Sequence, residues 1–563
     1  MHARQPCDEL GNDLPPNTPP LPRAGEQPLD DYSLYGSRAE FELADFLYRK
    51  EQMSGKKIDK LMEIWATFSA SNDPDSNTPS PPPFANAADV YNTIDSTELG
   101  DIPWQAFLVK YNGTLPDGTP PTSMTNSYEV WFRDPLKFLE DQIGNPDFNG
   151  EMDYAAYQVY GPDRKRRFKD MMCRQIGHGS SQYVVQLFHS SLAHILSSLK
   201  PWMIKPRITR CANRHFRWVI YGFGPYIADY PEQALLSCIV SGWCAKCTAK
   251  STDLDGDPSA IPRSHVHTQE LRHLIDDDLK VLWDGWGIIG DVIPFTAHFP
   301  QANIHELPSS DLLHQIIKGT FKDHLVTWVG EYLEVVHGTA RANEILADID
   351  RQIAAVPLFP GLRRFPEGRG FKQWTGDDSK ALMKVYLPAI AGHVPSQLVR
   401  AISAFLEYCY LVRQSEITED TLAAIDNALA RFHAIREIFI TSGVREDFLL
   451  PRQHSLVHYR HLIQDFGAPN GLCSSITESK HIKAVKEPWR RSNCNQPLGQ
   501  MLLVNQHLDK LAAARVDFQT RGMLKGSGHP VLVPAIPCHD QGEVDDVEED
   551  QGMTSLGDVQ LAK

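Results

Sequence analysis

The 563-residue sequence lacks the features that mark membrane, secreted and disulfide-stabilised proteins. No stretch approaches the ~18 consecutive apolar residues of a membrane span, and residues 1–31 contain no apolar segment like that of a secretory signal. Ten cysteines are too few in so long a chain for a disulfide scaffold. The sequence therefore predicts a protein of the cytosol or nucleus with no membrane partner.

The common catalytic and nucleotide-binding motifs are also missing. The sequence contains no Walker loop, no glycine-rich dinucleotide motif, no Gly-x-Ser-x-Gly and no His-Glu-x-x-His. Positive charge is scarce as well, because the formal net charge is −16. A surface that is basic throughout is excluded, although a local basic groove can bind DNA within an acidic protein.

Apolar periodicity and turn-forming residues divide the chain into segments of different character. The pattern predicts a mixed α/β piece interrupted by a mainly helical one, with disordered ends. The predicted segments are a disordered N-terminal tail (1–32), a helical segment (33–70), a Pro/Ser-rich linker (71–87), a small α+β segment (88–170), an α/β region with a Cys-x-x-Cys pair (183–248), a loop-rich and then helical region (249–465), a further helical region (466–523) and an acidic disordered tail (524–563).

Asp229, in the stretch "ADYPEQALLSCIVSGWCAKC", is the first candidate functional residue. It ends an aromatic, strand-like run, which is where α/β enzymes often hold catalytic metal, and hard divalent cations prefer oxygen ligands. The same residue also fits a helix N-cap, with Pro231 two residues on and Glu232 at the third helical position. Both roles stay open, and one residue can fill both.

Cys244 and Cys247 form a Cys-x-x-Cys pair, which is half of a zinc site by spacing. The stretch "RSHVHTQELRH" follows and supplies His265 and His267, with His273 further on. Two thiolates and two imidazoles would complete a structural tetrahedral site. Free thiols and a redox pair are the alternatives.

A basic helix is predicted in "CSSITESKHIKAVKEPWRR". Ser475-x-x-Glu478 matches a capping box at its start. Glu478 could hold a metal ion while the basic side chains contact phosphates, or it could cap the helix above a solvated face. The candidate DNA-binding residues are Lys480, Lys483, Lys486, Arg490 and Arg491.

Two further acids are interpreted as structural. Asp311 is predicted to begin a helix, and His314 shares its face three residues later. Asp170 lies in "RRFKDMMCRQ", which is predicted to be helical, and it is therefore not a candidate ligand.

Four long stretches together resemble Plavaka-type transposases, which are transposon-encoded proteins of mushroom-forming fungi related to CACTA (En/Spm) transposases. The resemblance runs from about Tyr35 to Met523. The stretches are "YGFGPYIADYPEQALLSCIVSGWCAKC", "DVIPFTAHFPQANIHELPSSDLLHQIIKGTFKDHLVTWV", "AVPLFPGLRRFPEGRGFKQWTGDDSKALMKVYLPAIAGHVP" and "LPRQHSLVHYRHLIQDFGAPNGLCSSITESKHIKAVKEPWRRS".

The resemblance implies an RNase H-like core that cuts and joins DNA with two Asp residues, one Glu and two Mg²⁺ or Mn²⁺ ions. Asp229 matches the second Asp of this triad and Glu478 the terminal Glu. Residues 183–248 are then a remnant of the core, residues 466–523 contain its last helix, and the helical region between them is an insertion. Transposon ends are the implied partner, a homo-oligomer is left open, and a functional copy would be nuclear.

One part of the family pattern is missing. Relatives carry a long segment with an "SDKT"-like strand, which supplies the first Asp, where this chain has only "CRQIGHGSSQYVV". We therefore expect an incomplete RNase H-like core and a degenerate protein without catalysis, which could also be cytoplasmic. The alternatives are a DNA- or chromatin-binding module and a zinc-stabilised interaction protein.

Overall fold

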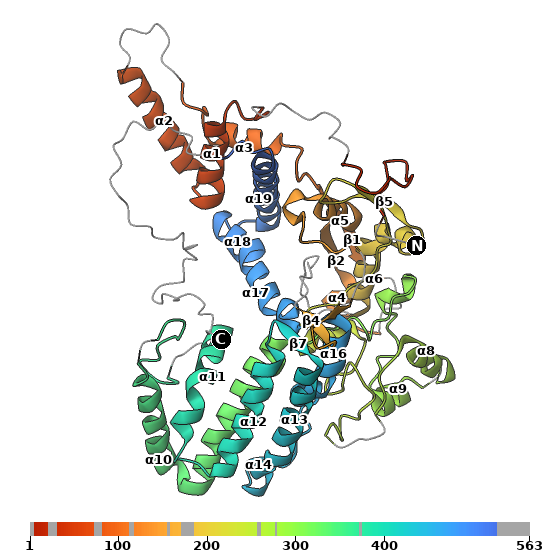
Figure 1. The fold of residues 1–563 in the computed structure, drawn as a ribbon, viewed down its shortest axis with the longest axis vertical. Coiled ribbons are helices and arrows are strands. Elements are labelled where there is room, and N and C mark those ends of the chain that lie inside the picture. The colour runs from red at the N-terminus through yellow and green to blue at the C-terminus, as the bar shows by residue number, and fades with distance from the viewer. Residues whose placement is uncertain are drawn as a thin grey trace.

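The chain folds as a mixed α/β protein in which helices predominate (Figure 1). Its strands form three small antiparallel sheets, with the orders β1-β2, β3-β4-β7 and β5-β6. Within the described ranges no sheet exceeds three strands, so the RNase H-like core stays a prediction. The computed structural model describes residues 5–20, 31–72, 81–111, 117–154, 158–169, 185–255, 260–275, 278–357, 359–370 and 374–525.

The first helices of the chain and its last described helix pack together as one helical unit, seen at the top of Figure 1. Its core joins the first helices to the last one, and the rings of Phe41 and Phe518 meet edge to face with centroids 4.8 Å apart. Buried Asp45 pairs with Arg49 and Arg515 and so links the same two parts. The elements are α1 (Arg38–Asp45), η1 (Phe46–Lys50), α2 (Gly55–Asn72), α3 (Ala87–Asp95) and α19 (Pro497–Thr520).

A small α/β part follows in the chain. The helix α5 begins at Pro135 with Asp134 as its N-cap, and the aromatic stretch before residue 220 forms a strand. Residues 5–20, which the sequence predicts to be disordered, lie against that strand, where Cys7 N donates to Phe216 O (2.9 Å). The elements are β1 (Trp104–Lys110), α4 (Thr122–Thr125), β2 (Ser127–Arg133), α5 (Pro135–Gly144), η2 (Pro146–Phe148), α6 (Val185–Ile195), η3 (Leu196–Met203), β5 (Arg207–Arg210) and β6 (Phe216–Val219).

The "RRFKDMMCRQ" stretch is not helical where the structure describes it, so that prediction was wrong. Residues Arg166–Lys169 form β4, which pairs with β3 (Val159–Tyr160) and β7 (Glu416–Thr418). Alternation along β4 buries Phe168 opposite Ile417, and this long-range pairing outweighs the local helical pattern. Asp170 and residues 173–184, where the resemblance leads us to expect a missing segment, lie outside the described residues.

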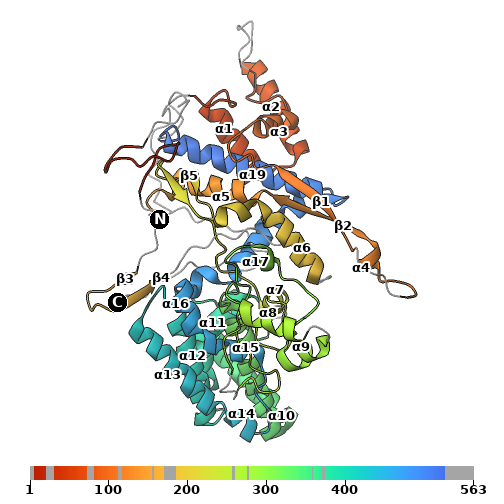
Figure 2. The ribbon, with the colours of Figure 1, turned by 90° about the vertical axis from the view of Figure 1, so that its right-hand side faces the viewer.

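Long amphipathic helices form a block at the bottom of Figures 1 and 2 around the largest core of the molecule. The first of them is a π-helix in which a Cβ on Gly319 would lie 2.1 Å from the carbonyl oxygen of His314, so only glycine fits. The elements are η5 (Leu312–Val326), α10 (Thr327–Ala354), α11 (Gly376–Ile390), α12 (Ser396–Val412), α13 (Glu419–Ile435), α14 (Ile438–Thr441), α15 (Pro451–His454), η6 (Ser455–His458), α16 (Tyr459–Phe466) and η7 (Pro469–Leu472).

Short helices and loops connect the α/β part to the helical block. They are α7 (Tyr230–Leu236), α8 (His265–Leu274), α9 (Leu279–Trp286) and η4 (Phe295–His298). The connection back to α19 is a helical arm, residues 475–491, made of α17 (Ser475–His481), η8 (Ile482–Lys486) and α18 (Glu487–Arg491). None of the described helices combines the length and the apolar content that a membrane crossing requires.

Candidate functional site

Two cysteines and two histidines gather between the loop after α7 and the helices α15 and η6. The ligand atoms of Cys244, Cys247, His454 and His458 all lie within 4.8 Å of one another. Cys244 Sγ is 3.2 Å from His458 Nε2, and Cys247 Sγ is 3.1 Å from His454 Nε2. A tetrahedral zinc ion would hold such sulfur and nitrogen atoms about 3.6 Å apart. The donor set and its spacing therefore fit zinc.

The surroundings of His454 and Cys244 suit metal ligands. His454 Nδ1 donates to the carbonyl oxygen of Leu254 (2.5 Å), which leaves the lone pair of Nε2 facing the cysteines. Burial raises the pKa of Cys244, but hydrogen bonds from Cys247 and from backbone N–H groups bring it down to about 7. A thiolate is therefore accessible near neutral pH.

Two buried arginines contact the loop that carries Cys244 and Cys247. Arg263, 5% exposed, donates from Nε to the carbonyl oxygens of Cys244 and Cys247, both at 2.9 Å. Arg436 of the segment after α13 pairs with Asp255, next to the Leu254 carbonyl, and donates to Gln453 (2.7 Å). Arg436 thus joins the segment at Asp255 to α15, the helix that carries His454.

The histidines beside the cysteines are not the two named from the sequence. His265 and His267 lie in the first turn of α8, where the ring of His267 packs edge to face on Trp286. His454 and His458 take the places beside the thiols, from a segment more than 200 residues downstream of Cys247 in the chain. One signal could have identified them, because His-x₃-His places two imidazoles on one helical face and completes the spacing of Cys₂His₂ zinc sites.

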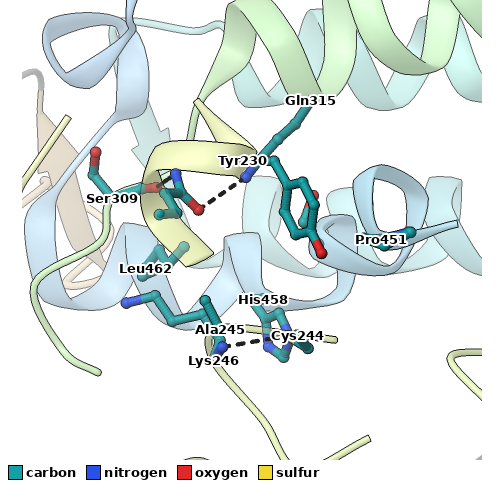
Figure 3. A pocket seen from close by; sticks show the side chains of 11 residues that line it. Tyr230, Cys244, Ala245, Lys246, Ser309, Gln315, Pro451, His458 and Leu462 are labelled. Atoms are coloured by element: carbon teal, nitrogen blue, oxygen red, sulfur yellow. Dashed lines mark hydrogen bonds between the residues drawn. The ribbon is translucent and has the colours of Figure 1, made fainter. Parts of the chain in front are cut away.

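A narrow pocket opens beside this cluster (Figure 3). Tyr230, Cys244 and His458 line it, and Lys246 extends away from the cysteines toward the carbonyl oxygen of His305 (2.9 Å). The volume open to a water-sized molecule in this pocket is about 20 Å³, which is room for about one water. The pocket is therefore too small for a nucleotide.

Asp229 is the N-cap of α7. Its Oδ1 accepts a hydrogen bond from Glu232 N (3.0 Å), as the helix-cap interpretation predicts. The acid at the third helical position does not close a capping box, because Glu232 instead accepts from Tyr226 OH (2.8 Å). Burial, with a smaller contribution from Asp229, raises the pKa of Glu232.

The chain segment that ends at Asp229 lies parallel to the one that ends at Asp311. Tyr226 bridges Pro308 in a parallel arrangement, with Tyr226 N donating to Leu307 O (2.7 Å) and Ser309 N to Tyr226 O (2.9 Å). Each Asp lies three residues after its bridging residue, and each caps a helix. The sequence reading of Asp311 as a helix cap is confirmed.

Glu478 lies at the start of the arm and contacts two cationic side chains. Its Oε1 is 3.2 Å from His314 Nε2 and 3.3 Å from Lys318 Nζ. The hydrogen bond from His314 lowers the pKa of Glu478. The predicted capping box does not form, because the N-cap is Ser474 and its hydroxyl donates to Asp311 (2.6 Å).

The basic residues of the arm face solvent. Every residue from Glu478 to Lys486 is exposed, and Arg490 is exposed as well. Within the described ranges no acidic side chain pairs with the arm cations Lys480, Lys483, Lys486 and Arg490. Arg491 instead lies over the ring of Tyr48, 4.2 Å from its centroid. The arm therefore offers four unneutralised positive charges.

The two predicted catalytic acids have other partners in the structure. Asp229 caps α7, and Glu478 contacts His314 and Lys318. Among the described residues, the Cys₂His₂ cluster is the one group of three or more Cys, His, Asp or Glu side chains placed to hold a metal ion.

Comparison with known protein families gives one match. Residues 84–182 and 177–329 match the family model of the Plavaka transposase, and together they span less than half of the chain. Asp229, Cys244 and Cys247 lie within the second matched stretch, while Glu478 and the basic arm lie beyond it. No curated protein matches the chain. The family match supports a Plavaka-type transposase.

Proposed function

We propose that this chain is a transposon-derived DNA-binding protein, similar to Plavaka-type DDE transposases, that no longer cuts DNA. The family match implies DNA as the partner and suggests a DDE-like origin. The basic arm is the surface that would contact the phosphates, since its cations are exposed and lack acidic partners among the described residues. Unneutralised Lys and Arg side chains are what phosphate contacts require.

The proposed loss of catalysis depends mainly on the contacts that Glu478 makes. A terminal catalytic acid has to offer its carboxylate to metal ions, but here the carboxylate contacts His314 and Lys318. The first acid of the triad is also not accounted for, because the family segment that would carry it is missing from the sequence. The family match is split into two stretches that overlap at residues 177–182, the place where the proposal puts the deletion. Losing about 5 kcal/mol of transition-state stabilisation would slow cleavage ~10³–10⁴-fold.

The Cys₂His₂ cluster is assigned a structural role. Four protein ligands would close the coordination sphere of zinc, whereas a catalytic zinc keeps one position open. In this proposal the ion, held by Cys244, Cys247, His454 and His458, ties the loop after α7 to the helical block. It supplies cross-linking and no chemistry on DNA.

DNA binding and cleavage can be tested on the same purified full-length chain. Gel shifts with a labelled duplex should show binding that weakens steeply as the salt concentration rises. When Lys480, Lys483 and Lys486 are all replaced with Gln, the plot of log K against log salt should become less steep, by about 0.9 for each lost phosphate contact. Replacing Lys56, Lys57 and Lys60 of α2 with Gln is the matched control and should leave the slope unchanged. Strand transfer of terminal-repeat DNA that depends on Mg²⁺ or Mn²⁺ would refute the loss of catalysis.

A zinc-stabilised interaction protein without a nucleic-acid role is the second candidate, favoured by the net charge of −16. It predicts no gel shift at low salt and a full equivalent of zinc. Binding that the arm substitutions weaken would exclude it.

A further inference from the structure

The arm meets the helical block at a buried carboxylate. Asp311 is 0% exposed and accepts from the backbone N–H groups of Leu313 and His314 (both 3.1 Å), which begin η5. The same carboxylate accepts from the backbone N–H and the hydroxyl of Ser474 (3.2 and 2.6 Å), which begin α17. One acid therefore accepts hydrogen bonds at the start of two helices and holds Ser474, the residue just before the arm.

A second contact lies one helical turn further along the arm. His314 Nδ1 is 2.9 Å from Asp311 Oδ2, and its Nε2 is 3.2 Å from Glu478 Oε1. Both ring nitrogens face carboxylates, so both donate and the ring carries a positive charge. Lys318 reaches the same Glu478 oxygen from the next turn of η5 (3.3 Å). Ser474 and Glu478 lie four residues apart on one face, so two attachments set the direction of the arm as well as its position.

The far end of the arm is attached to the terminal helical unit. Pro488 has no N–H for the carbonyl oxygen of Ala484, which instead accepts from Asn505 Nδ2 of α19 (2.9 Å). Arg491 packs on Tyr48 of η1. Between these two ends residues 478–486 are exposed. Figure 1 shows α17 and α18 running from the helical block toward α19.

We infer that a latch at the base of the arm positions the basic side chains for DNA, and that it consists of Asp311, His314, Lys318 and Glu478. The inference rests on the proposed DNA-binding function. In it Glu478 is a positioning residue rather than a ligand of a divalent ion, and its partners take the place that metal ions would need. An arm held in its binding geometry loses less conformational entropy when DNA binds.

The latch can be tested with Glu478→Gln, His314→Gln and the double variant in the full-length chain. Each single variant should weaken DNA binding about fivefold, and the double variant should lose no more than a single one, because both remove the same contact. The salt slope should not change, since no phosphate contact is lost. Trypsin should cut the freed arm faster at Lys480 and Lys483. Glu487→Gln, on the same arm outside the latch, is the control and should behave as the wild type.

Two results would overturn the latch. One is wild-type DNA affinity and arm cleavage in Glu478→Gln, an exposed and isosteric change that should leave the fold intact. The other is an additive loss of about 25-fold in the double variant. If the wild type binds no DNA, the proposed function fails while the trypsin digestion still tests the latch.

Discussion

At the scale of single residues, side chains of the same type have different partners in this fold. Asp229 and Asp311 end two parallel segments, yet Asp229 makes an ordinary helix cap while Asp311 also receives Ser474 and a charged His314. Burial by itself would lower the pKa of His314, but its bonds to Asp311 and Glu478 raise it to about 9. The partners that a fold brings to a residue, rather than its type, decide what it does.

The cysteine–histidine cluster gives the first prediction at this scale. Cys247→Ser should reduce bound zinc from one equivalent to well below one, and the free energy of unfolding should fall by several kcal/mol, because the ion cross-links segments that are distant in sequence. Elemental analysis and urea unfolding measure the two effects.

Two control variants change a cysteine and a histidine that lie outside the cluster. Cys494→Ser removes an exposed thiol outside the cluster and should change neither quantity. His265→Ala should keep the zinc, because that side chain lies on α8 outside the cluster. Loss of zinc in His265→Ala with retention in His454→Ala would contradict the assignment.

At the scale of elements, the sequence predicts what local patterns determine. The caps at Asp229 and Asp311 and the helix at Pro135 follow from neighbouring residues, and the structure has all three. Strand β4 and the partners of the cysteines depend on Ile417 and on His454, which are far away in the chain. No local pattern shows that β4 pairs with β7, and the one signal for the cysteine partners, the His-x₃-His spacing of His454 and His458, was not used in the sequence analysis.

The cap of α7 can be tested apart from any catalytic role. Asp229→Ala removes the acceptor for Glu232 N and should lower the free energy of unfolding by about 1 kcal/mol, whereas Asp229→Asn should lower it by only a few tenths. Urea unfolding followed by circular dichroism provides the measurement. As a control, Asp377→Ala changes an acid that is 87% exposed and should cost less than about 0.5 kcal/mol. Equal losses in Asp229→Ala and Asp229→Asn would show that charge, and not capping, is what matters there.

At the scale of the whole molecule, stability should depend on pH through histidines that the fold keeps neutral. Burial lowers the pKa of four of them from 6.5, to about 4 for His189, His324 and His433 and to about 3 for His305. Above pH 6.5 these residues are neutral in both states and have no effect. As pH falls from 6.5 to 4 the unfolded chain binds protons first, so the free energy of unfolding falls, by up to about 3 kcal/mol for each residue.

His324 allows this pH dependence to be measured at one site. Its ring stacks on Trp328, with centroids 5.4 Å apart, so His324→Phe keeps an aromatic ring there while removing the titrating group. Between pH 6.5 and 5 the variant should lose about 2 kcal/mol less stability than the wild type. Taking the difference between the two proteins cancels the protonation of the cysteine–histidine cluster, which both share. His461→Gln, at a side chain that is 73% exposed, should follow the wild-type curve. Identical slopes for His324→Phe and the wild type would mean that folding does not lower the pKa of His324, because only a group that binds its proton equally in both states leaves the slope unaltered.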